Sequence, residues 1–264
     1  MPRTFDAFVI LAEMRTGSNA LEARLNDYVG LQSFGEVFNP GFIGGPGKGP
    51  LFGVTIVERD RDPQIMVAAM RAGTDGLPGF RHFSDHDPRV LERCLADRRT
   101  AKIILTRNPL DSYVSLKIAR ETGQWWLGER GKRKAAKVRF DPREFEAFVA
   151  KRSAHQALIR RRLRETGQTA FELDYSEVGD DAIIAGCARF LGATRLRQER
   201  SRKGKVQNPA PLSEKVVNVS EMVAALAARD PLEADFAASF EPARGNTQAG
   251  HRCLPSVTAG PSAR

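Results

Sequence analysis

The chain has 264 residues, of which 41% are hydrophobic, so it can bury the core of one large domain, as an ordinary soluble globular protein does. Its 41 lysines and arginines outnumber 32 acidic residues, and the net charge of +9 favours an anionic ligand, a nucleic acid or an acidic surface as partner. The three cysteines, Cys94, Cys187 and Cys253, lack CxxC spacing and argue against a disulfide framework or a zinc site.

The amino-terminal segment contains only a short apolar run, which Glu13 interrupts. Such a run is too short for the core of a secretory signal or for a membrane span. Together with the odd number of scattered cysteines, it predicts a cytoplasmic protein.

Short apolar segments alternate with amphipathic ones along the chain. Residues 5–13 predict a strand buried on both faces, and residues 17–28 a helix that begins near Ser18. The glycine- and proline-rich residues 41–53 predict a loop. Further along, we expect helices over 62–73, 87–97, 108–120, 141–167 and 176–192, and strands over 77–83, 101–105 and 169–175.

This alternation predicts an α/β domain, because parallel neighbouring strands need crossover connections, which are usually helices. We expect one three-layer domain over residues 1–241, with a central, mostly parallel sheet flanked by helices. Residues 242–264 contain too few apolar side chains to order themselves well and are predicted to form a tail.

The first predicted strand is followed by a loop suited to an anion. Arg15, Thr16, Gly17, Ser18 and Asn19 join it to the next helix, where free backbone N–H groups can cradle an oxyanion. The loop is P-loop-like but lacks the GxxxxGK[ST] pattern and its lysine, so an ATPase or GTPase is weakly supported. No GxGxxG follows the strand either.

A second polar site follows the strand at 101–105. Arg107 lies at its carboxyl end, and Ser115 falls about two turns into the next helix, on a face that can look back toward the strand. Pro109 and Asp111 both suit a helix start. Because ligands of parallel sheets bind beyond the carboxyl ends of the strands, Arg107 and Ser115 can converge on one anion.

The order of these motifs resembles that of sulfotransferases that use 3′-phosphoadenosine 5′-phosphosulfate (PAPS). The resemblance rests on "VILAEMRTGSNAL", "KIILTRNPLDSYVS" and a late "RKGK", and it extends from residue 5 to residue 227. The segments "SFGEVFNP", "GFRHF", "KIARETGQWW" and "QNPAPLSEKVVNVSEMVAAL" are most similar to bacterial carbohydrate sulfotransferases of the trehalose and nodulation-factor type.

The resemblance implies a donor site. The loop Arg15, Thr16, Gly17, Ser18 and Asn19 would hold the 5′-phosphosulfate, with Arg15 as the cation that stabilises charge on the departing phosphate. A second set would surround the 3′-phosphate and the adenine. It comprises Arg107 and Ser115 at the family's spacing, the late basic residues Arg202, Lys203 and Gly204, and Tyr175. The 3′-phosphate contacts would distinguish PAPS from ordinary adenine nucleotides.

The general base is a separate question, because the acceptor hydroxyl must lose a proton. Many animal members use a histidine in a Lys-x-His pattern, which "GFRHF" breaks, whereas trehalose sulfotransferase-like enzymes use a glutamate. Glu36 occupies that position, in an apolar loop expected to raise its pKa. His82 and His86 are lesser candidates, more typical of structural or surface histidines. Arg81 would contact either the donor or the acceptor.

The acceptor would be a hydroxyl-bearing small molecule or saccharide. Trp125 and Trp126 could stack on a sugar ring or a phenol, although paired tryptophans also anchor loops and dimer contacts. Residues 41–53 could line the same site. The family reaction yields 3′-phosphoadenosine 5′-phosphate and needs no metal, and related bacterial enzymes suggest a homodimer.

Three other functions stay open on the sequence. A kinase-like P-loop enzyme would share the sheet and basic loops but would need a Walker lysine and an acid for magnesium. A nucleic-acid-binding module would explain the net charge without catalysis, although no helix-turn-helix, zinc or RNP pattern is present. A sulfotransferase relative could also bind the nucleotide without transferring sulfate.

Overall fold

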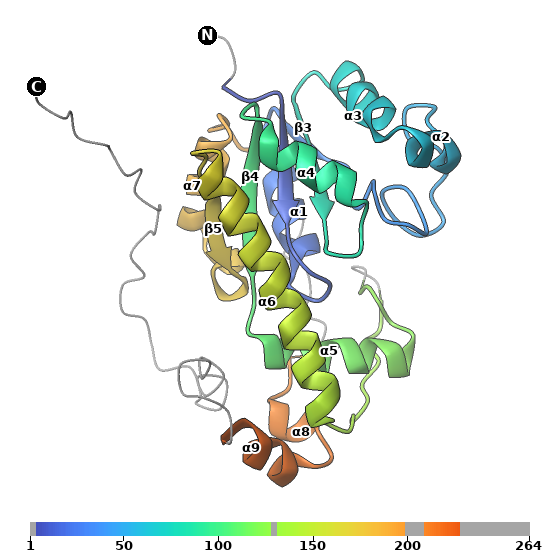
Figure 1. The fold of residues 1–264 in the computed structure, drawn as a ribbon, viewed down its shortest axis with the longest axis vertical. Helices are drawn as coiled ribbons and strands as arrows, with labels where there is room; N and C mark the ends of the chain where they lie inside the picture. Colours follow the sequence, from blue (N-terminus) through green and yellow to red (C-terminus); the bar gives the residue numbers. More distant parts are fainter. Residues whose placement is uncertain (1–3, 128–130, 199–208, 228–264) are drawn as a thin grey trace, which may run out of the picture.

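The computed structural model describes residues 4–127, 131–198 and 209–227, and a five-stranded sheet lies at its centre (Figure 1). The strand order is β2-β3-β1-β4-β5, and all four pairings are parallel. The strands are β1 (Ala7–Leu11), β2 (Leu31–Ser33), β3 (Leu77–His82), β4 (Thr100–Thr106) and β5 (Phe171–Asp174). The α/β fold class with a parallel sheet is thereby confirmed.

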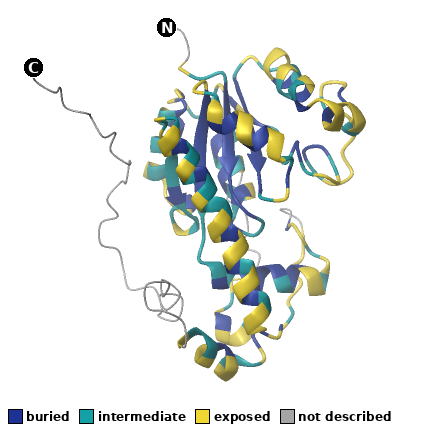
Figure 2. Cartoon of the chain, viewed as in Figure 1, coloured by how far each residue is buried: buried dark blue, intermediate teal, exposed yellow. Residues whose placement is uncertain are grey.

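Helices cover both faces of the sheet because its central strands are apolar on both sides. In β1, Phe8 and Ile10 join one core with α1 (Ser18–Asn26) and α7 (Asp181–Phe190). Val9 and Leu11 join a second core with α3 (Pro63–Ala72), α4 (Pro88–Ala96) and α6 (Pro142–Glu165). This alternation follows from the two-residue period of a strand. Figure 2 shows the buried strands between helices whose outer faces are exposed.

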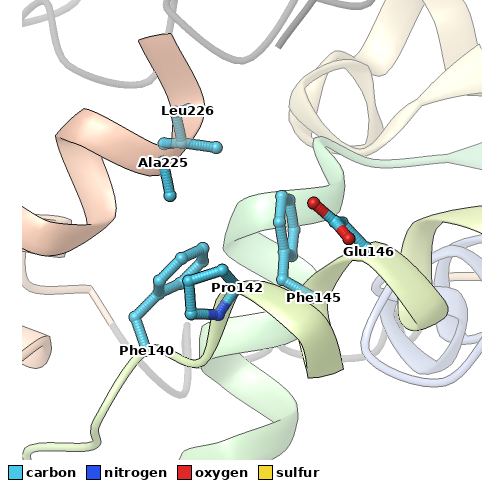
Figure 3. Close-up of a pocket in the computed structure, with 6 residues that line it drawn as sticks. All are labelled: Phe140, Pro142, Phe145, Glu146, Ala225 and Leu226. Carbon is cyan, nitrogen blue, oxygen red and sulfur yellow. The ribbon is translucent and has the colours of Figure 1, made fainter. Parts of the chain in front are cut away.

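A third core lies beyond the carboxyl end of the sheet, in the lower part of Figure 1. It joins α5 (Pro109–Thr122) and the start of α6 to two helices that the sequence patterns did not predict, α8 (Leu212–Lys215) and α9 (Val219–Ala227). Figure 3 shows a small pocket in this core. None of the candidate site residues lines this pocket. Its lining consists of Phe140, Pro142, Phe145, Glu146, Ala225 and Leu226.

Two segments differ from expectation. The helix expected over 176–192 divides into a 3-10 helix (Tyr175–Gly179) and α7, because the Asp180 side chain caps the backbone N–H groups of Ala182 and Ile183. A helix that was not predicted, α2 (Ile56–Arg61), follows the loop at 41–53. The expected tail (242–264) and the late basic residues Arg202, Lys203 and Gly204 lie outside the described residues.

Candidate active site

The loop between β1 and α1 has two left-handed residues. The φ angle is +70° at Arg15 and +90° at Gly17, and no side chain caps the first turn of α1. Backbone of this kind turns successive N–H groups toward a shared concavity, and the start of a helix adds positive potential. A Cβ at Gly17 would lie 2.3 Å from the Tyr175 ring, so glycine is required there for two reasons.

Side-chain donors hold three successive carbonyl groups of this loop. These carbonyl oxygens are therefore already hydrogen-bonded within the protein. The three bonds are Thr16 Oγ1 to Glu13 O (2.7 Å), Arg152 Nη2 to Met14 O (2.6 Å) and Arg107 Nη1 to Arg15 O (2.9 Å).

The expected convergence of Arg107 and Ser115 is seen, with Arg15 between them. Arg15 Nε donates to Ser115 Oγ (3.0 Å), while its Nη1 donates to the carbonyl of Trp125 (2.7 Å). The Arg107 guanidinium lies over the Tyr175 ring, 4.2 Å from its centroid. Residues from β1, β4, α5 and the segment after β5 therefore meet beyond the carboxyl ends of the central strands.

This cluster is rich in positive charge. Burial, reinforced by the nearby charge of Arg107, lowers the pKa of Arg15 to about 10. Burial also lowers the pKa of Arg152 to about 10. The Glu13 carboxylate raises this pKa, and the charge of Arg107 lowers it. The pKa of Lys215 falls for the same two reasons, burial and Arg107, against a favourable effect of Asp111. Cations gathered in this way are stabilised by a bound anion.

Glu36 lies in a second, adjacent cluster. Its Oε1 is 3.2 Å from Arg81 Nη1, and its Oε2 accepts a hydrogen bond from Asn39 Nδ2 (2.9 Å) and lies 3.6 Å from His86 Nε2. Burial alone would raise the pKa of Glu36, but His86, Arg81 and Asn39 together lower it below its ordinary value. The raised pKa expected from the apolar loop is therefore wrong, because three polar partners outweigh the loss of solvent.

Arg81 connects the two clusters. Its guanidinium is buried between Glu36 and Glu22, whose Oε2 lies 3.0 Å from Arg81 Nε. Arg81 Nη1 also donates to Ser18 Oγ (3.3 Å) in the first turn of α1. The loop before α1 and the candidate base Glu36 thus share one cation.

His82 is unsuited to act as the base. It is 1% exposed, and its Nε2 lies 3.1 Å from the carbonyl oxygen of Asp87. Burial and neighbouring His86 lower the pKa of His82 to about 3. These contacts are those of a buried structural histidine, and that role stays a prediction.

The remaining nominated residues lie at the edge of the clusters. Asn19 is exposed in the first turn of α1. Trp125 and Trp126, which follow α5, are 49% and 67% exposed. In the part of the chain that the structure describes, no group of three or more metal-binding side chains is found, and no helix is long and apolar enough to cross a membrane.

The sequence patterns missed several residues that hold the site in place. Arg59 of α2 is 2% exposed and fixes the loop beyond Glu36 by donating to three carbonyl oxygens, those of Val37, Asn39 and Phe42, each at 2.9 Å. The Thr55–Glu58 capping box was a signal that could have revealed α2. Arg152 and His155 of α6, which contact Met14 and Glu13, carried no comparable local signal.

Comparison with known proteins identifies the family. The chain is 30% identical to Nodulation protein H of Rhizobium tropici, a sulfotransferase, over 200 residues that cover 73% of this chain and 78% of that protein. The chain belongs to the sulfotransferase family. No family model matches it. A solved sulfotransferase from Alicyclobacillus acidocaldarius aligns over 91% of this chain and 100% of its own, with 15% identity and a TM-score of 0.44.

Membership confirms the sulfotransferase resemblance that the sequence motifs indicated and makes sulfotransferase the enzyme class of this protein. Nodulation protein H was matched over most of its length, so the likeness is not limited to one motif.

Proposed function

We propose that this sulfotransferase transfers the sulfuryl group of PAPS to a hydroxyl of a carbohydrate or glycolipid and releases 3′-phosphoadenosine 5′-phosphate. The observation that carries the proposal is the meeting of Arg15, Arg107 and Ser115 beside the uncapped start of α1. Three polar groups, from the segments after β1 and β4 and from α5, there lie beside a helix start, which suits a ligand with two separate phosphate groups.

The proposed donor contacts follow from this arrangement. Arg15 and the N–H groups of Gly17, Ser18 and Asn19 bind the 5′-phosphosulfate at the start of α1, while Thr16 holds the loop through its bonds to the Glu13 carbonyl. Arg107 and Ser115 bind the 3′-phosphate. Tyr175, which already stacks against Arg107, lies beside the adenine. Arg152 and Lys215 add positive potential to the same region.

Glu36 is the proposed general base. Its lowered pKa keeps the carboxylate ionised at neutral pH, so it can accept the proton of the attacking hydroxyl. As the acceptor oxygen bonds to sulfur, the bond from sulfur to the bridging phosphate oxygen breaks. The charge that develops on the departing phosphate is stabilised by Arg15 and the start of α1. Arg81 contacts both Glu36 and Ser18 and so fixes the position of the base relative to the donor loop.

The acceptor site is proposed to lie between Glu36 and the exposed indoles. Trp125 is bonded through its carbonyl to Arg15, which places the loop after α5 next to the donor cluster. Flat apolar rings with exposed faces suit a sugar. A cytoplasmic location and a homodimer remain expectations from the sequence. Among the described cysteines, Cys94 and Cys187 are buried and form no disulfide.

Calorimetric titration tests the donor site. We expect 3′-phosphoadenosine 5′-phosphate to bind more tightly than 5′-AMP or ATP, and Arg107→Ala to weaken that binding ~10–100-fold, the effect of losing charge-assisted hydrogen bonds. Arg161→Ala, on the exposed face of α6, is the matched control and should bind like the wild type. Equal binding of the three nucleotides, or tighter binding of ATP with magnesium, would support the kinase-like alternative instead.

A further inference from the structure

His86 is a buried histidine beside the proposed base. It is 4% exposed, and its ring packs against Phe83 (centroids 4.9 Å apart) and His82 (5.3 Å). The residue was ranked as a lesser candidate for the base, but its surroundings indicate a different role.

The hydrogen bonds of the ring define where its proton lies. The backbone N–H of Phe83 donates to His86 Nδ1 (3.3 Å), and a ring nitrogen that accepts a hydrogen bond carries no proton. The proton of the neutral imidazole is therefore on Nε2. A second proton would have to bind Nδ1, and two N–H groups, those of Nδ1 and of Phe83, would then face each other. The ring is therefore poorly placed to pass on the proton that Glu36 receives.

The Nε2–H group lacks a partner among the described residues. Nε2 is buried without a hydrogen bond, and its nearest acceptors are Glu36 Oε2 at 3.6 Å and Asp85 Oδ1 at 4.0 Å. A buried donor is costly until it is paired. Catalytic hydrogen bonds are often long in a ligand-free enzyme and shorten in the reacting complex.

Glu36 has room for this additional donor. A carboxylate offers about four acceptor sites, and here Asn39 and Arg81 are the other groups that face it. Oε2 accepts one hydrogen bond, from Asn39 at 2.9 Å, and a carboxylate oxygen can accept a second, from His86. A shift of a fraction of an ångström closes the gap.

We propose that His86 is a positioning residue that acts through Glu36. Its Nε2, 3.6 Å from Glu36 Oε2 in the ligand-free protein, orients the carboxylate and favours the ionised form that accepts the proton, and the gap closes to a hydrogen bond in the reacting complex. The inference rests on the proposed function, because it gives Glu36 the role of base.

The test compares His86→Phe with His86→Gln, whose side-chain amide can place an N–H near the position of Nε2. The carboxyl titration of Glu36 is followed by ¹³C NMR, with its signal assigned through Glu36→Gln. In His86→Phe we expect the midpoint to rise by about one pH unit, because the carboxylate loses the polar ring nitrogen that faces it at 3.6 Å. We also expect kcat to fall ~10-fold, and 3′-phosphoadenosine 5′-phosphate to bind as before. His86→Gln should recover most of both changes.

His82→Gln is the matched control, because His82 is equally buried but contacts the Asp87 carbonyl rather than Glu36. It should leave the Glu36 midpoint unchanged. An unchanged midpoint in folded His86→Phe would overturn the inference. If the variants do not fold, the ¹⁵N shifts of His86 in the wild type test the inference instead. A proton on Nδ1 at neutral pH would contradict the proposed contact of Nε2–H with Glu36.

Failure of the proposed function gives a different result. If the wild type neither prefers the 3′-phosphorylated nucleotide nor transfers sulfate, the role of Glu36 as base is lost. The ¹³C titration still shows whether His86 and Glu36 interact, since it needs no substrate. The two outcomes are therefore separable.

Discussion

Glu36 illustrates how a buried carboxylate stays ionised when its partners outweigh the loss of solvent. Arg81, Asn39 and His86 all favour its charged form. We expect Glu36→Gln to lower kcat ~10²–10⁴-fold, because the amide cannot accept a proton, while binding of 3′-phosphoadenosine 5′-phosphate is kept. Steady-state kinetics and calorimetry on the same preparation measure both. Equal loss of binding and turnover would show that Glu36 has a structural role rather than that of the base.

The pH dependence of turnover follows from the same residue. If Glu36 is the base, as proposed, it acts as the carboxylate, and kcat falls as the pH drops through its pKa. Because that pKa lies below the ordinary value of 4.5, we expect the midpoint of the fall in kcat to lie below pH 4.5. Stopped assays across this range measure the profile. A midpoint near neutral pH would assign the titration to another group.

Gly17 is the second residue whose identity the structure explains. Its φ of +90° and the Tyr175 ring, 2.3 Å from a Cβ built there, both oppose any side chain. We expect Gly17→Ala to lower the free energy of unfolding by ~1–2 kcal/mol from the backbone alone, and to weaken nucleotide binding by displacing Tyr175. Urea unfolding and calorimetry measure the two effects. Gly30→Ala, also at positive φ but with open space around the added Cβ, separates backbone strain from the clash.

At the level of elements, Arg15 connects the donor loop to the segment after α5. Its Nη1 donates to the Trp125 carbonyl, and Trp125 and Trp126 are the two tryptophans of the whole chain. A bound phosphate competes for Arg15, so we expect 3′-phosphoadenosine 5′-phosphate to change the intrinsic tryptophan fluorescence. Titration of emission against nucleotide concentration measures this, with Arg15→Gln as the variant that should lose most of the change. If calorimetry shows binding but tryptophan emission does not change, nucleotide binding at Arg15 does not affect Trp125 and Trp126, and the prediction is wrong.

At the scale of the whole molecule, the buried His82 makes stability depend on pH. Its pKa is about 3 in the folded protein against 6.5 for an ordinary histidine, so between these values the unfolded chain binds a proton that the folded protein does not. Stability is therefore complete above pH 6.5 and falls as the pH drops toward 3, with a limiting slope of about 1.4 kcal/mol per pH unit. Urea unfolding at pH 7, 6 and 5 measures the slope, and His82→Gln should flatten it. An equal slope in that variant would assign it to other groups.

The sequence by itself indicated four of the five strands, the six helices packed around them, the parallel sheet, and the placement of Arg15 and Arg107 after strand ends with Ser115 on the next helix. These features depend on local periodicity and on the chirality of strand–helix connections, which a single chain displays. Family membership also followed from motifs in order, and the comparison with Nodulation protein H confirms it.

The tertiary structure alone decided the rest. The ionisation of Glu36, the bridge made by Arg81, and the support from Arg59 and Arg152 depend on contacts between residues far apart in the chain. The apolar sequence around Glu36 predicted a raised pKa, and packing reversed it. The physical reason is that a pKa and a buried hydrogen bond depend on which groups surround a side chain in space, and local sequence does not contain that information.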